Sequence, residues 1–245
     1  MADISLRDAF FNRLYELAKI DRNIVIISAD MGAPSLDKFR TDLSSQFINV
    51  GIAEQNMVTL ATGLALSGKK IYTYAIMPFA SLRCYELIKV DISLMNVGVT
   101  IVGVGSGFSY NDSGPTHHST EDISAMRVLP NMTILNPSTS RMAGKFAELS
   151  YRMSNPCYIR IDRGLQPEIY PEDAEFSDGL VSLKTGEDIC IVATGNMVHR
   201  ALEVVELLSK NSIDAGVIDL YRIRPINKDM LLNYVKQVKM VVTLE

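Results

Sequence analysis

The sequence predicts an α/β fold in which a parallel β-sheet is covered by helices on both faces. Apolar, β-branched runs alternate with helical patterns along most of the 245 residues, which is typical of repeated strand–helix units. The runs at 24–29 (IVIISA) and 99–104 (VTIVGV) are mostly apolar, without polar–apolar alternation, as expected for strands that are buried on both faces. These two observations define the predicted fold class.

A first domain is predicted over residues 1–165. Ser5 can cap a first helix whose apolar stripe starts at Leu6 and Phe10, and Gly68 can end a later helix in a left-handed conformation. After the first helix, the expected elements are strands at 24–29 and 47–50, a helix at 54–67, a strand at 70–74, a helix at 79–94, strands at 99–104 and 132–135, a helix at 139–153 and a strand at 157–161.

A segment rich in proline and acid at 166–178 has no apolar period and predicts an exposed linker. Residues 179–245 then begin a second, smaller α/β domain. Its expected elements are a strand at 189–193, a helix at 197–208, a strand at 215–220, a helix at 227–234 and a strand at 240–244. Because the last apolar strand lacks a covering helix, we expect this domain to be incomplete or to be covered by a partner.

Composition excludes several classes of function. The balance of 24 Lys and Arg against 28 Asp and Glu gives a net charge of −4 without a basic run, so neither nucleic acid nor a membrane is an expected partner. No membrane-spanning run or signal peptide is visible, which predicts a cytoplasmic location. Cys84, Cys157 and Cys190 lie far apart, outside any C-x-x-C motif, and predict reduced core thiols.

A loop at 105–119 follows the strand at 99–104 and shows no regular period. Ligands of open α/β sheets collect beyond the carboxyl ends of strands, so chemistry is expected at this loop. Gly103, Gly105 and Gly107 form a G-x-G-x-G run after this strand. No helical pattern follows the run, so it does not fit a dinucleotide-binding fingerprint. The sequence also lacks G-x-S-x-G and Walker A motifs.

Glu54 follows a short strand and Gly51, in the first turn of a predicted helix. One interpretation is that this carboxylate only complements the helix dipole. The other is that it faces a ligand at the carboxyl end of the strand, where burial and the helix terminus would shift its pKa in opposite directions. The spacing leaves both open.

His117 and His118 precede a segment in which Ser119 or Thr120 resembles a helix cap. Adjacent histidines do not converge on one metal ion, and no H-E-x-x-H is present, so acid–base or hydrogen-bonding work is favoured over a metal site. A purely structural role remains the alternative for each.

Arg160 and Arg163 lie at the end of the strand at 157–161 and could hold a phosphate or carboxylate. The alternative is a surface ion pair with Asp162 or with the acidic linker.

Five segments taken together resemble the pyrimidine-binding half of transketolase. They are SADM at 28–31, VGIAEQNM at 50–57, the aromatic stretch that reaches Phe79, GPTHHSTEDISAMRVLPNM at 114–132 and RIDRG at 160–164. Their order and approximate spacing are similar to that family over nearly the whole chain. Split transketolases, whose carboxyl-terminal section is a separate chain, look most similar, whereas deoxyxylulose phosphate synthase and the beta subunits of 2-oxo acid dehydrogenases share the layout more loosely.

The resemblance implies thiamine diphosphate as the cofactor, which would perform the carbanion chemistry. Glu54 matches the glutamate that bonds the aminopyrimidine ring nitrogen, and Phe79 matches an aromatic that stacks on that ring. His117 matches the histidine that contacts a hydroxyl of the donor ketose, with His118 as a second candidate for proton transfer. Further matches are implied for a sugar phosphate (Arg163, Arg7 and Ser35) and for an acidic residue near the cofactor (Asp30). Arg160 stays a candidate for substrate binding from its place at the end of the strand at 157–161.

Several positions depart from the family pattern. Ile76 stands where the family usually has a second aromatic at the cofactor. Gly105 or Ser106 replaces a histidine that contacts substrate phosphate. Ser113, with Asp112 beside it, stands where an aspartate would read donor stereochemistry. The identity of the sugar, and whether it is phosphorylated, therefore stays open.

The family holds the cofactor's diphosphate through a divalent ion on a G-D-G motif followed by Asn, and no G-D-G occurs here. Mg²⁺ prefers phosphate, carboxyl and amide oxygens in octahedral geometry, so the resemblance implies that a separate amino-terminal subunit holds Mg²⁺ and the diphosphate. We expect no metal ligands on this chain, and an α2β2 assembly.

The leading hypothesis is a split transketolase subunit that moves a two-carbon ketol group from a ketose donor to an aldose acceptor. Two alternatives are the beta subunit of a 2-oxo acid dehydrogenase-type decarboxylase and a non-catalytic interaction subunit.

Overall fold

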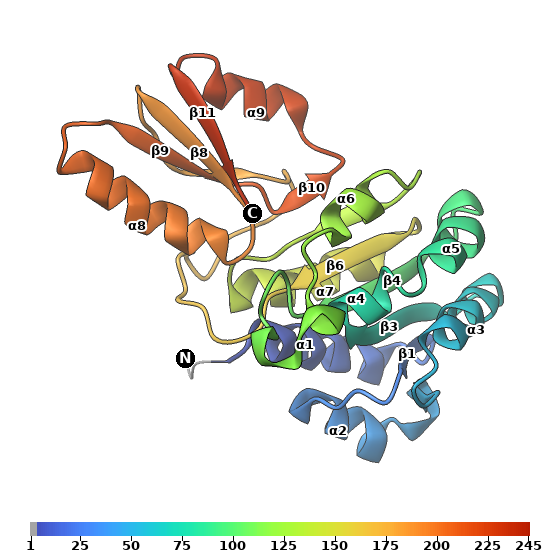
Figure 1. Cartoon of the computed structure of the whole chain (residues 1–245). Helices are drawn as coiled ribbons and strands as arrows, with labels where there is room; N and C mark the ends of the chain where they lie inside the picture. The colour runs from blue at the N-terminus through green and yellow to red at the C-terminus, as the bar shows by residue number, and fades with distance from the viewer. Residues whose placement is uncertain (1–3) are drawn as a thin grey trace.

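The computed structural model describes residues 4–245 as two α/β units (Figure 1). The larger unit contains the strands β1 (Ile24–Ser28), β2 (Phe47–Asn49), β3 (Lys70–Ile76), β4 (Val99–Val104), β5 (Thr133–Leu135) and β6 (Cys157–Ile161). Its helices are α1 (Leu6–Ile20), α2 (Pro34–Asp42), α3 (Glu54–Leu66), α4 (Met77–Ala80), α5 (Tyr85–Leu87), α6 (Asp122–Arg127) and α7 (Ser140–Arg152), with a π-helix η2 (Ile88–Leu94) and 3-10 turns η1 (Ser44–Gln46), η3 (Asn111–Ser113) and η4 (Pro115–His117). Ser5 caps α1, as predicted, by accepting a hydrogen bond from the amide of Asp8.

The larger sheet has seven strands in the order β10-β5-β6-β4-β3-β1-β2. All neighbours are parallel except for the edge strand β10 (Arg222–Arg224), which runs antiparallel to β5. Strands β1, β4 and β6 are buried along their full length, as the continuous apolar runs predict. The predicted fold class, a parallel sheet covered by helices, is confirmed.

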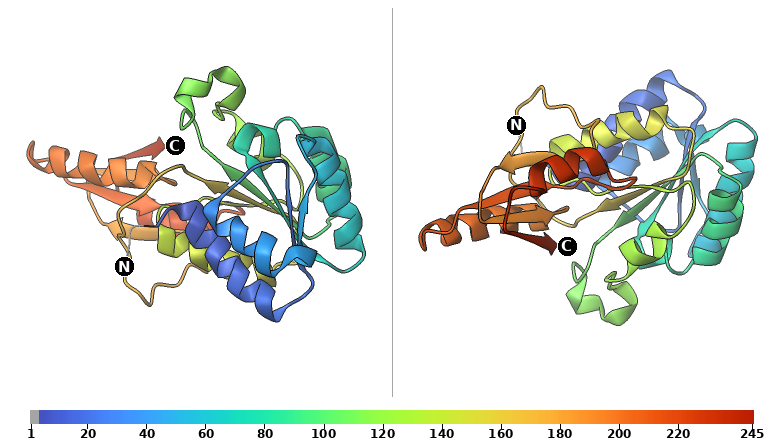
Figure 2. Two further views of the ribbon diagram at one scale, coloured as in Figure 1. Left: turned by 90° about the horizontal axis from the view of Figure 1, so that it is seen from below. Right: turned by 90° about the horizontal axis from the view of Figure 1, so that it is seen from above.

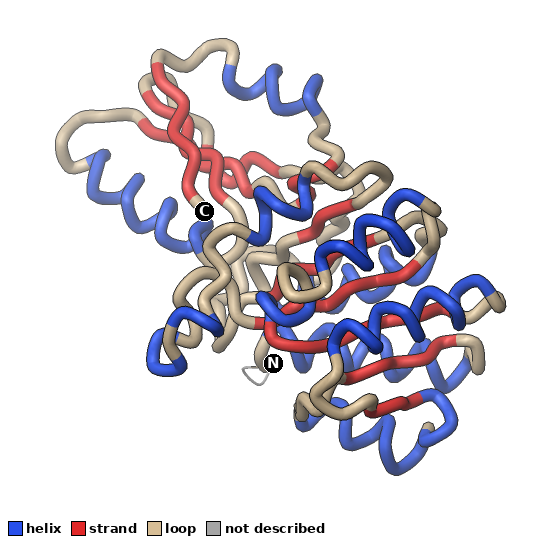
Figure 3. Tube along the Cα trace, turned by 45° about the vertical axis from the view of Figure 1, so that its right-hand side comes forward, coloured by secondary structure: helices blue, strands red, loops and turns tan. Residues whose placement is uncertain are grey.

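Helices cover both faces of this sheet (Figures 2 and 3). On one face, residues of α1, α2 and α7 form an apolar core with the sheet, and α1 and α7 pack against each other. On the other face, α3, η2 and α6 form a second core. This arrangement leaves the carboxyl ends of the parallel strands as the edge where loops gather.

The smaller unit is a four-stranded sheet with the order β11-β8-β9-β7. Its elements are β7 (Val181–Lys184), β8 (Ile189–Ala193), α8 (Met197–Ser209), β9 (Ala215–Asp219), α9 (Lys228–Val235) and β11 (Met240–Leu244). Helices α8 and α9 pack into separate clusters, one on each face of the sheet. The strands β7 and β10, which are short and only partly buried, and the helix α2 of the larger unit have no counterpart among the predicted elements.

The single helix that the sequence predicts over 79–94 is wrong. The chain instead forms α4, a turn, α5 and η2. Pro78 occupies the first turn of α4, and the hydroxyl of Ser81 donates to the carbonyl of Met77 at 2.6 Å. Such side-chain bonds compete with continuation of a helix. The turn between α4 and α5 carries Arg83, whose contacts are described below.

The segment at 166–178 is not simply an exposed linker. Tyr170 and Phe176 are buried in the core of the larger unit, where their rings lie 5.0 Å apart. Phe176 also packs against Phe146 and Tyr221. The prolines and acids of this segment are typical of an exposed linker, but its two aromatic side chains anchor it to the core.

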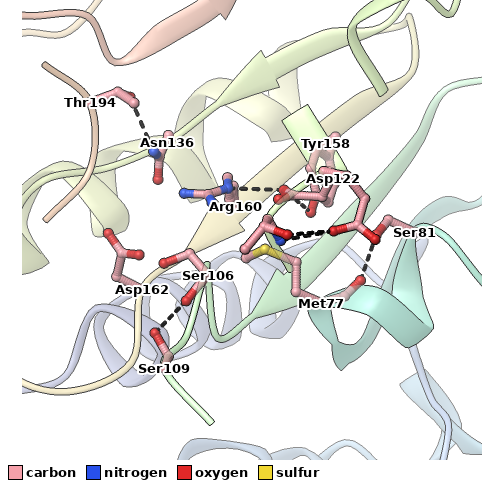
Figure 4. A network of polar contacts seen from close by, with 12 residues as sticks. Met77, Ser81, Ser106, Ser109, Asp122, Asn136, Tyr158, Arg160, Asp162 and Thr194 are labelled. Atoms are coloured by element: carbon pink, nitrogen blue, oxygen red, sulfur yellow. Dashed lines mark hydrogen bonds and ion pairs between the residues drawn. The ribbon is translucent and has the colours of Figure 1, made fainter. Parts of the chain in front are cut away.

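The two units are joined by pairing as well as by chain connectivity. Strand β10 follows β9 in sequence but pairs with β5 of the larger sheet. The amide group of Asn136 donates to the hydroxyl of Thr194 at 3.1 Å (Figure 4), and the backbone N–H of Asn196 donates to Asp162 Oδ2 at 2.6 Å. These contacts lie at the carboxyl ends of β5, β6 and β8.

Asp219 is a buried carboxyl at the same junction. It accepts hydrogen bonds at Oδ2 from Ser138 Oγ at 2.5 Å and from Tyr170 Oη at 2.6 Å. Burial raises the pKa of Asp219 to about 7, although the two hydroxyl groups partly oppose the rise. The ionisation of Asp219 is therefore coupled to the contact between the units. No helix in residues 4–245 has the length and apolar character needed to cross a bilayer.

Candidate active site

Most of the predicted site residues follow the carboxyl ends of parallel strands. Asp30 follows β1, Glu54 follows β2, Ile76 ends β3 and Arg163 follows β6. The loop after β4 carries both histidines. The topology thus gathers residues that are far apart in sequence along one edge of the sheet.

Glu54 is the first residue of α3 and its side chain is only 5% exposed. Gly51 makes the turn that precedes it, with a φ of 72° that a side chain would disfavour. The carboxylate of Glu54 therefore lies inside the protein rather than on a solvated helix end. A buried carboxylate needs a polar partner, so this position favours the interpretation that Glu54 faces a ligand over simple complementation of the helix dipole.

The carboxylate of Glu54 is paired with Arg83. Arg83 Nη1 lies 2.9 Å from Glu54 Oε2, and the Arg83 guanidinium lies 4.0 Å from the centre of the Phe79 ring. Burial, with the nearby charge of Glu54 as a second cause, raises the pKa of the Cys84 thiol to about 12. Cys84 therefore stays protonated beside this pair.

From Phe79, a row of flat side chains extends to Arg163. The imidazole of His117 packs edge-on against Phe79, with ring centres 5.0 Å apart, and lies 6.0 Å from the ring of Tyr110. The Arg163 guanidinium lies 4.7 Å from the centre of the Tyr110 ring. The structure thus brings four predicted residues together: Glu54, Phe79, His117 and Arg163.

His118 points to different neighbours. Its ring packs against Phe108 with centres 5.0 Å apart, and its buried Nε2 has no hydrogen-bond partner among the described residues. The predicted helix cap at Ser119 or Thr120 is wrong, because α6 begins at Asp122 without a side-chain cap. Ser119 instead pairs with Gly107 through two backbone hydrogen bonds of 2.9 Å, which close the loop.

Gly105 has a structural reason for lacking a side chain. Its φ is 92°, and a Cβ atom there would collide with the ring of Tyr110. Gly105, one of the two positions matched to the family's histidine, thus makes room for the tyrosine that contacts His117 and Arg163. Asp112 and Ser113 are exposed on η3 of the same loop.

Arg7 and Ser35, the two other residues matched to phosphate contacts, meet at a carboxylate. Arg7 Nη2 lies 3.1 Å from Asp8 Oδ2, and Ser35 Oγ donates to Asp8 Oδ1 at 2.8 Å. Burial opposes the charge of Asp8, but the hydrogen bonds from Arg7, Ser5 and Ser35 outweigh it and lower the pKa of this carboxyl. The cluster of Arg7, Ser35 and Asp8 therefore already contains a negatively charged group, the carboxylate of Asp8.

Asp30 and Ile76, the two other residues matched to the cofactor site, lie at the ends of β1 and β3. Asp30 adopts a left-handed φ of 52° and exchanges hydrogen bonds of 3.0 and 3.2 Å with the side chain of Asn49. The same Asn49 oxygen accepts the amide of Gly51 at 3.0 Å, which ties Asp30 to the turn before Glu54. Ile76 is half-buried between β3 and α4.

Arg160 lies in the interior (Figure 4). Its Nε bonds Asp122 Oδ2 at 2.9 Å, and Tyr158 Oη donates to the same oxygen at 2.9 Å. Burial disfavours the charge of Arg160, but the adjacent carboxylates of Asp122 and Asp162 outweigh it and raise its pKa. The expected alternative of a surface pair with Asp162 or the linker is wrong, because a buried partner 38 positions earlier takes the ion pair.

Sequence reasoning missed two members of the row, Arg83 and Tyr110. Arg83 stands four positions after Phe79, but no helix spans the two residues, because α4 ends at Ala80 and Arg83 lies in the turn before α5; helical spacing therefore gave no signal for their contact. Tyr110 carried no signal beyond being an aromatic residue in the loop. Within residues 4–245, no group of three or more His, Cys, Asp or Glu side chains is arranged to hold a metal ion.

Comparisons with known proteins identify the family to which the two units belong. The model of the transketolase pyrimidine-binding domain matches residues 2–168, and that of the transketolase C-terminal domain matches residues 179–245. The chain is 34% identical over 245 residues to a subunit of the apulose-4-phosphate transketolase of Phocaeicola vulgatus, covering 99% of this chain and 78% of that protein. It is 35% identical over 243 residues to the 6-deoxy-6-sulfo-D-fructose transketolase subunit SqwH of Clostridium sp. (strain MSTE9), covering 98% of this chain and 75% of that protein.

Among solved structures, the chain is similar to a split gene transketolase described as an inactive beta4 tetramer. The TM-score is 0.90 with 32% sequence identity, and the match covers 100% of this chain and 80% of the other. The resemblance inferred from the sequence is confirmed. Two matching domain models, these relatives and this fold together mean that the chain belongs to the transketolase family.

Proposed function

We propose that this chain is the pyrimidine-binding subunit of a split transketolase that moves a two-carbon ketol group from a ketose donor to an aldose acceptor. The observation that carries the proposal is the buried carboxylate of Glu54 beside the face of Phe79, with the His117 imidazole packed against the same ring. An acid, an aromatic face and an imidazole are the groups that a flat nitrogen heterocycle and a sugar hydroxyl require.

The residues present fit thiamine diphosphate. Arg83 bonds Glu54 and covers the ring of Phe79, so the site has room for a flat, nitrogen-bearing group that shares a proton with the carboxyl group of Glu54. Glu54 would hold the pyrimidine ring by a hydrogen bond to a ring nitrogen, and Phe79 would pack on its face. When bound, the cofactor supplies the carbon nucleophile for ketol transfer.

The other residues of the row act on the sugar. His117 would hydrogen-bond a donor hydroxyl. Thr116 Oγ1, 3.0 Å from His117 Nδ1, helps to fix the orientation of its ring. His118, with a buried and unpaired Nε2 among the residues that the structure describes, is the second candidate to move a proton. Arg163 is exposed next to Tyr110 and can attract an anionic end of the sugar.

We assign Mg²⁺ and the diphosphate to an amino-terminal partner subunit, because this sequence has no G-D-G and the described residues offer no metal cluster. The relatives that are named as transketolase subunits, and the split gene transketolase, support a two-chain enzyme. Thiamine diphosphate would then bind between two chains in an α2β2 assembly, in the cytoplasm.

The test is an assay with both chains. We would purify the protein with the amino-terminal transketolase subunit of the same genome, add thiamine diphosphate and Mg²⁺, and measure ketol transfer between sugars with and without an anionic end. Transfer that needs both chains and the cofactor supports the proposal. Oxidative decarboxylation of pyruvate, or the absence of cofactor binding, would replace it with one of the two alternatives.

A further inference from the structure

We propose that Arg83 is a further residue of the cofactor site, one that competes with the pyrimidine ring for Glu54 and Phe79 and withdraws from both as the ring binds. This inference rests on the proposed function and deepens it. It makes Arg83 a positioning residue that keeps the acid and the aromatic face arranged around a planar group.

The competition follows from the two contacts of one guanidinium. Arg83 Nη1 donates to Glu54 Oε2 at 2.9 Å, while the Arg83 Cζ atom lies 4.0 Å from the centre of the Phe79 ring. A guanidinium is planar, carries N–H donors at its edge and stacks on aromatic faces. An aminopyrimidine is likewise flat and stacks on aromatic faces, and a proton shared between its ring nitrogen and the carboxyl group makes the same kind of N–H···O contact. It therefore needs the same carboxyl group and a ring face in the same place.

The surroundings allow the Arg83 side chain to leave while its backbone stays fixed. The side chain is 42% exposed, in contrast to the 5% of Glu54. The backbone N–H of Arg83 donates to the carbonyl of Pro78 at 3.0 Å, and its own carbonyl accepts the side-chain amide of Gln55 at 3.3 Å. Rotation of one side chain toward solvent therefore frees both Glu54 and Phe79 without unfolding the turn.

The chain supplies a matched control for this arrangement. Arg40 also joins a carboxylate to an aromatic ring: its Nη1 lies 2.7 Å from Asp37 Oδ1 and its Cζ lies 5.1 Å from the centre of the Phe47 ring. This second arginine bridge joins α2 to β2, and none of its three residues belongs to the candidate site. An Arg40→Met variant removes the same kind of contact without touching the site.

The experiment measures the affinity of thiamine diphosphate, in the presence of Mg²⁺, for the complex of this chain with its amino-terminal partner. Calorimetry would compare the wild type with Arg83→Met, Arg83→Gln and Arg40→Met. We expect the two Arg83 variants to bind the cofactor about tenfold more tightly, since no competing cation has to leave, and Arg40→Met to bind as the wild type does. Unchanged or weaker binding by folded Arg83 variants would overturn the inference.

Two further outcomes separate this inference from the proposed function. If neither the wild type nor any variant binds thiamine diphosphate, the proposed function fails and the competition fails with it. If the wild type binds, a structure of the loaded complex decides the rest. Arg83 turned away from Glu54 supports the inference, and Arg83 still bonded to Glu54 Oε2 over the ring of Phe79 refutes it.

Discussion

Two carboxylate–arginine pairs of this protein have the same length but different surroundings. Arg160 Nε lies 2.9 Å from Asp122 Oδ2, and Arg83 Nη1 lies 2.9 Å from Glu54 Oε2. The Arg160 side chain is 9% exposed, whereas that of Arg83 is 42% exposed. The first arginine is enclosed by protein, and the second has a route to solvent. Burial of the cation, rather than the length of the bond, therefore distinguishes a pair that holds the fold from one that can open.

The largest effect is expected at the carboxylate of the open pair. A Glu54→Gln variant should lower ketol transfer about a hundredfold to ten-thousandfold, the usual range for loss of an acid–base group, and should leave the fold intact. The measurement is kcat/KM in the two-chain assay, with Glu86→Gln on α5 as the exposed control. A Glu54→Gln enzyme with wild-type kcat/KM would remove Glu54 from its proposed role.

The closed pair should instead act on stability. An Arg160→Met variant leaves Asp122 charged and buried, which costs about 3–5 kcal/mol of unfolding free energy in comparable cases. Urea denaturation of the purified chain measures the loss. Stability within about 1 kcal/mol of the wild type would contradict the structural role that burial assigns to Arg160.

Asp219 extends the comparison to a buried carboxyl whose partners are hydroxyl groups. Its pKa of about 7 in the folded state exceeds that of an unfolded aspartate, so the folded chain retains a proton that the unfolded chain releases. The unfolding free energy should therefore fall as the pH rises from about 4 to about 7, and level off above that.

An Asp219→Asn variant should lose this component of the pH dependence. The difference between wild-type and variant stability, measured by urea denaturation across that pH range, isolates it from other titrating groups. Asp188 is the control, because the hydrogen bond from Lys239 lowers its pKa and Asp188→Asn should change the profile in the opposite sense. Parallel profiles for wild type and Asp219→Asn would show that Asp219 is charged in the folded state.

Removing the cation of the open pair should have a smaller effect on stability than removing Arg160. We expect Arg83→Met to lower the unfolding free energy by about 1–2 kcal/mol, because the freed carboxylate of Glu54 lies near a solvent path. The same denaturation experiment provides the comparison. A loss equal to that of Arg160→Met would erase the distinction between the two pairs.

The smallest effect concerns the cluster at Asp8. An Asp8→Asn variant removes the anion that Arg7 and Ser35 now bond, and should raise the preference for phosphorylated over unphosphorylated donors about threefold, less than a full charge-assisted hydrogen bond contributes. The ratio of kcat/KM for the two donors measures this preference. A ratio that falls would mean that Asp8 supports the binding of anionic sugars.

The central strands were predictable from sequence because a strand that is buried on both faces has a long apolar run in its sequence. The strand at 99–104 is found at those bounds, and α1 begins at its predicted cap. The strands β7 and β10 and the break in the helix at 79–94 were not predictable in this way. Their residues gain their partners from distant segments, as Arg222 and Arg224 do from β5.

The candidate site also has a part that was predictable from sequence and a part that was not. Glu54, Phe79, His117 and Arg163 could be named from motifs, since each stands in a short segment with a family pattern. The pairing of Glu54 with Arg83, the role of Gly105 in admitting Tyr110, and the capture of Arg160 by Asp122 depend on how loops from separate strands meet. No spacing along the chain encodes those distances.

The placement of β10 also bears on how such chains can be recombined. A hybrid that joined the first 168 residues of this protein to the second unit of a relative would import a foreign edge strand into the larger sheet, because β10 pairs with β5. Exchange of the second unit would thus require complementary residues on β5 and β10. Engineers who shuffle these modules should move β5 and β10 as a set.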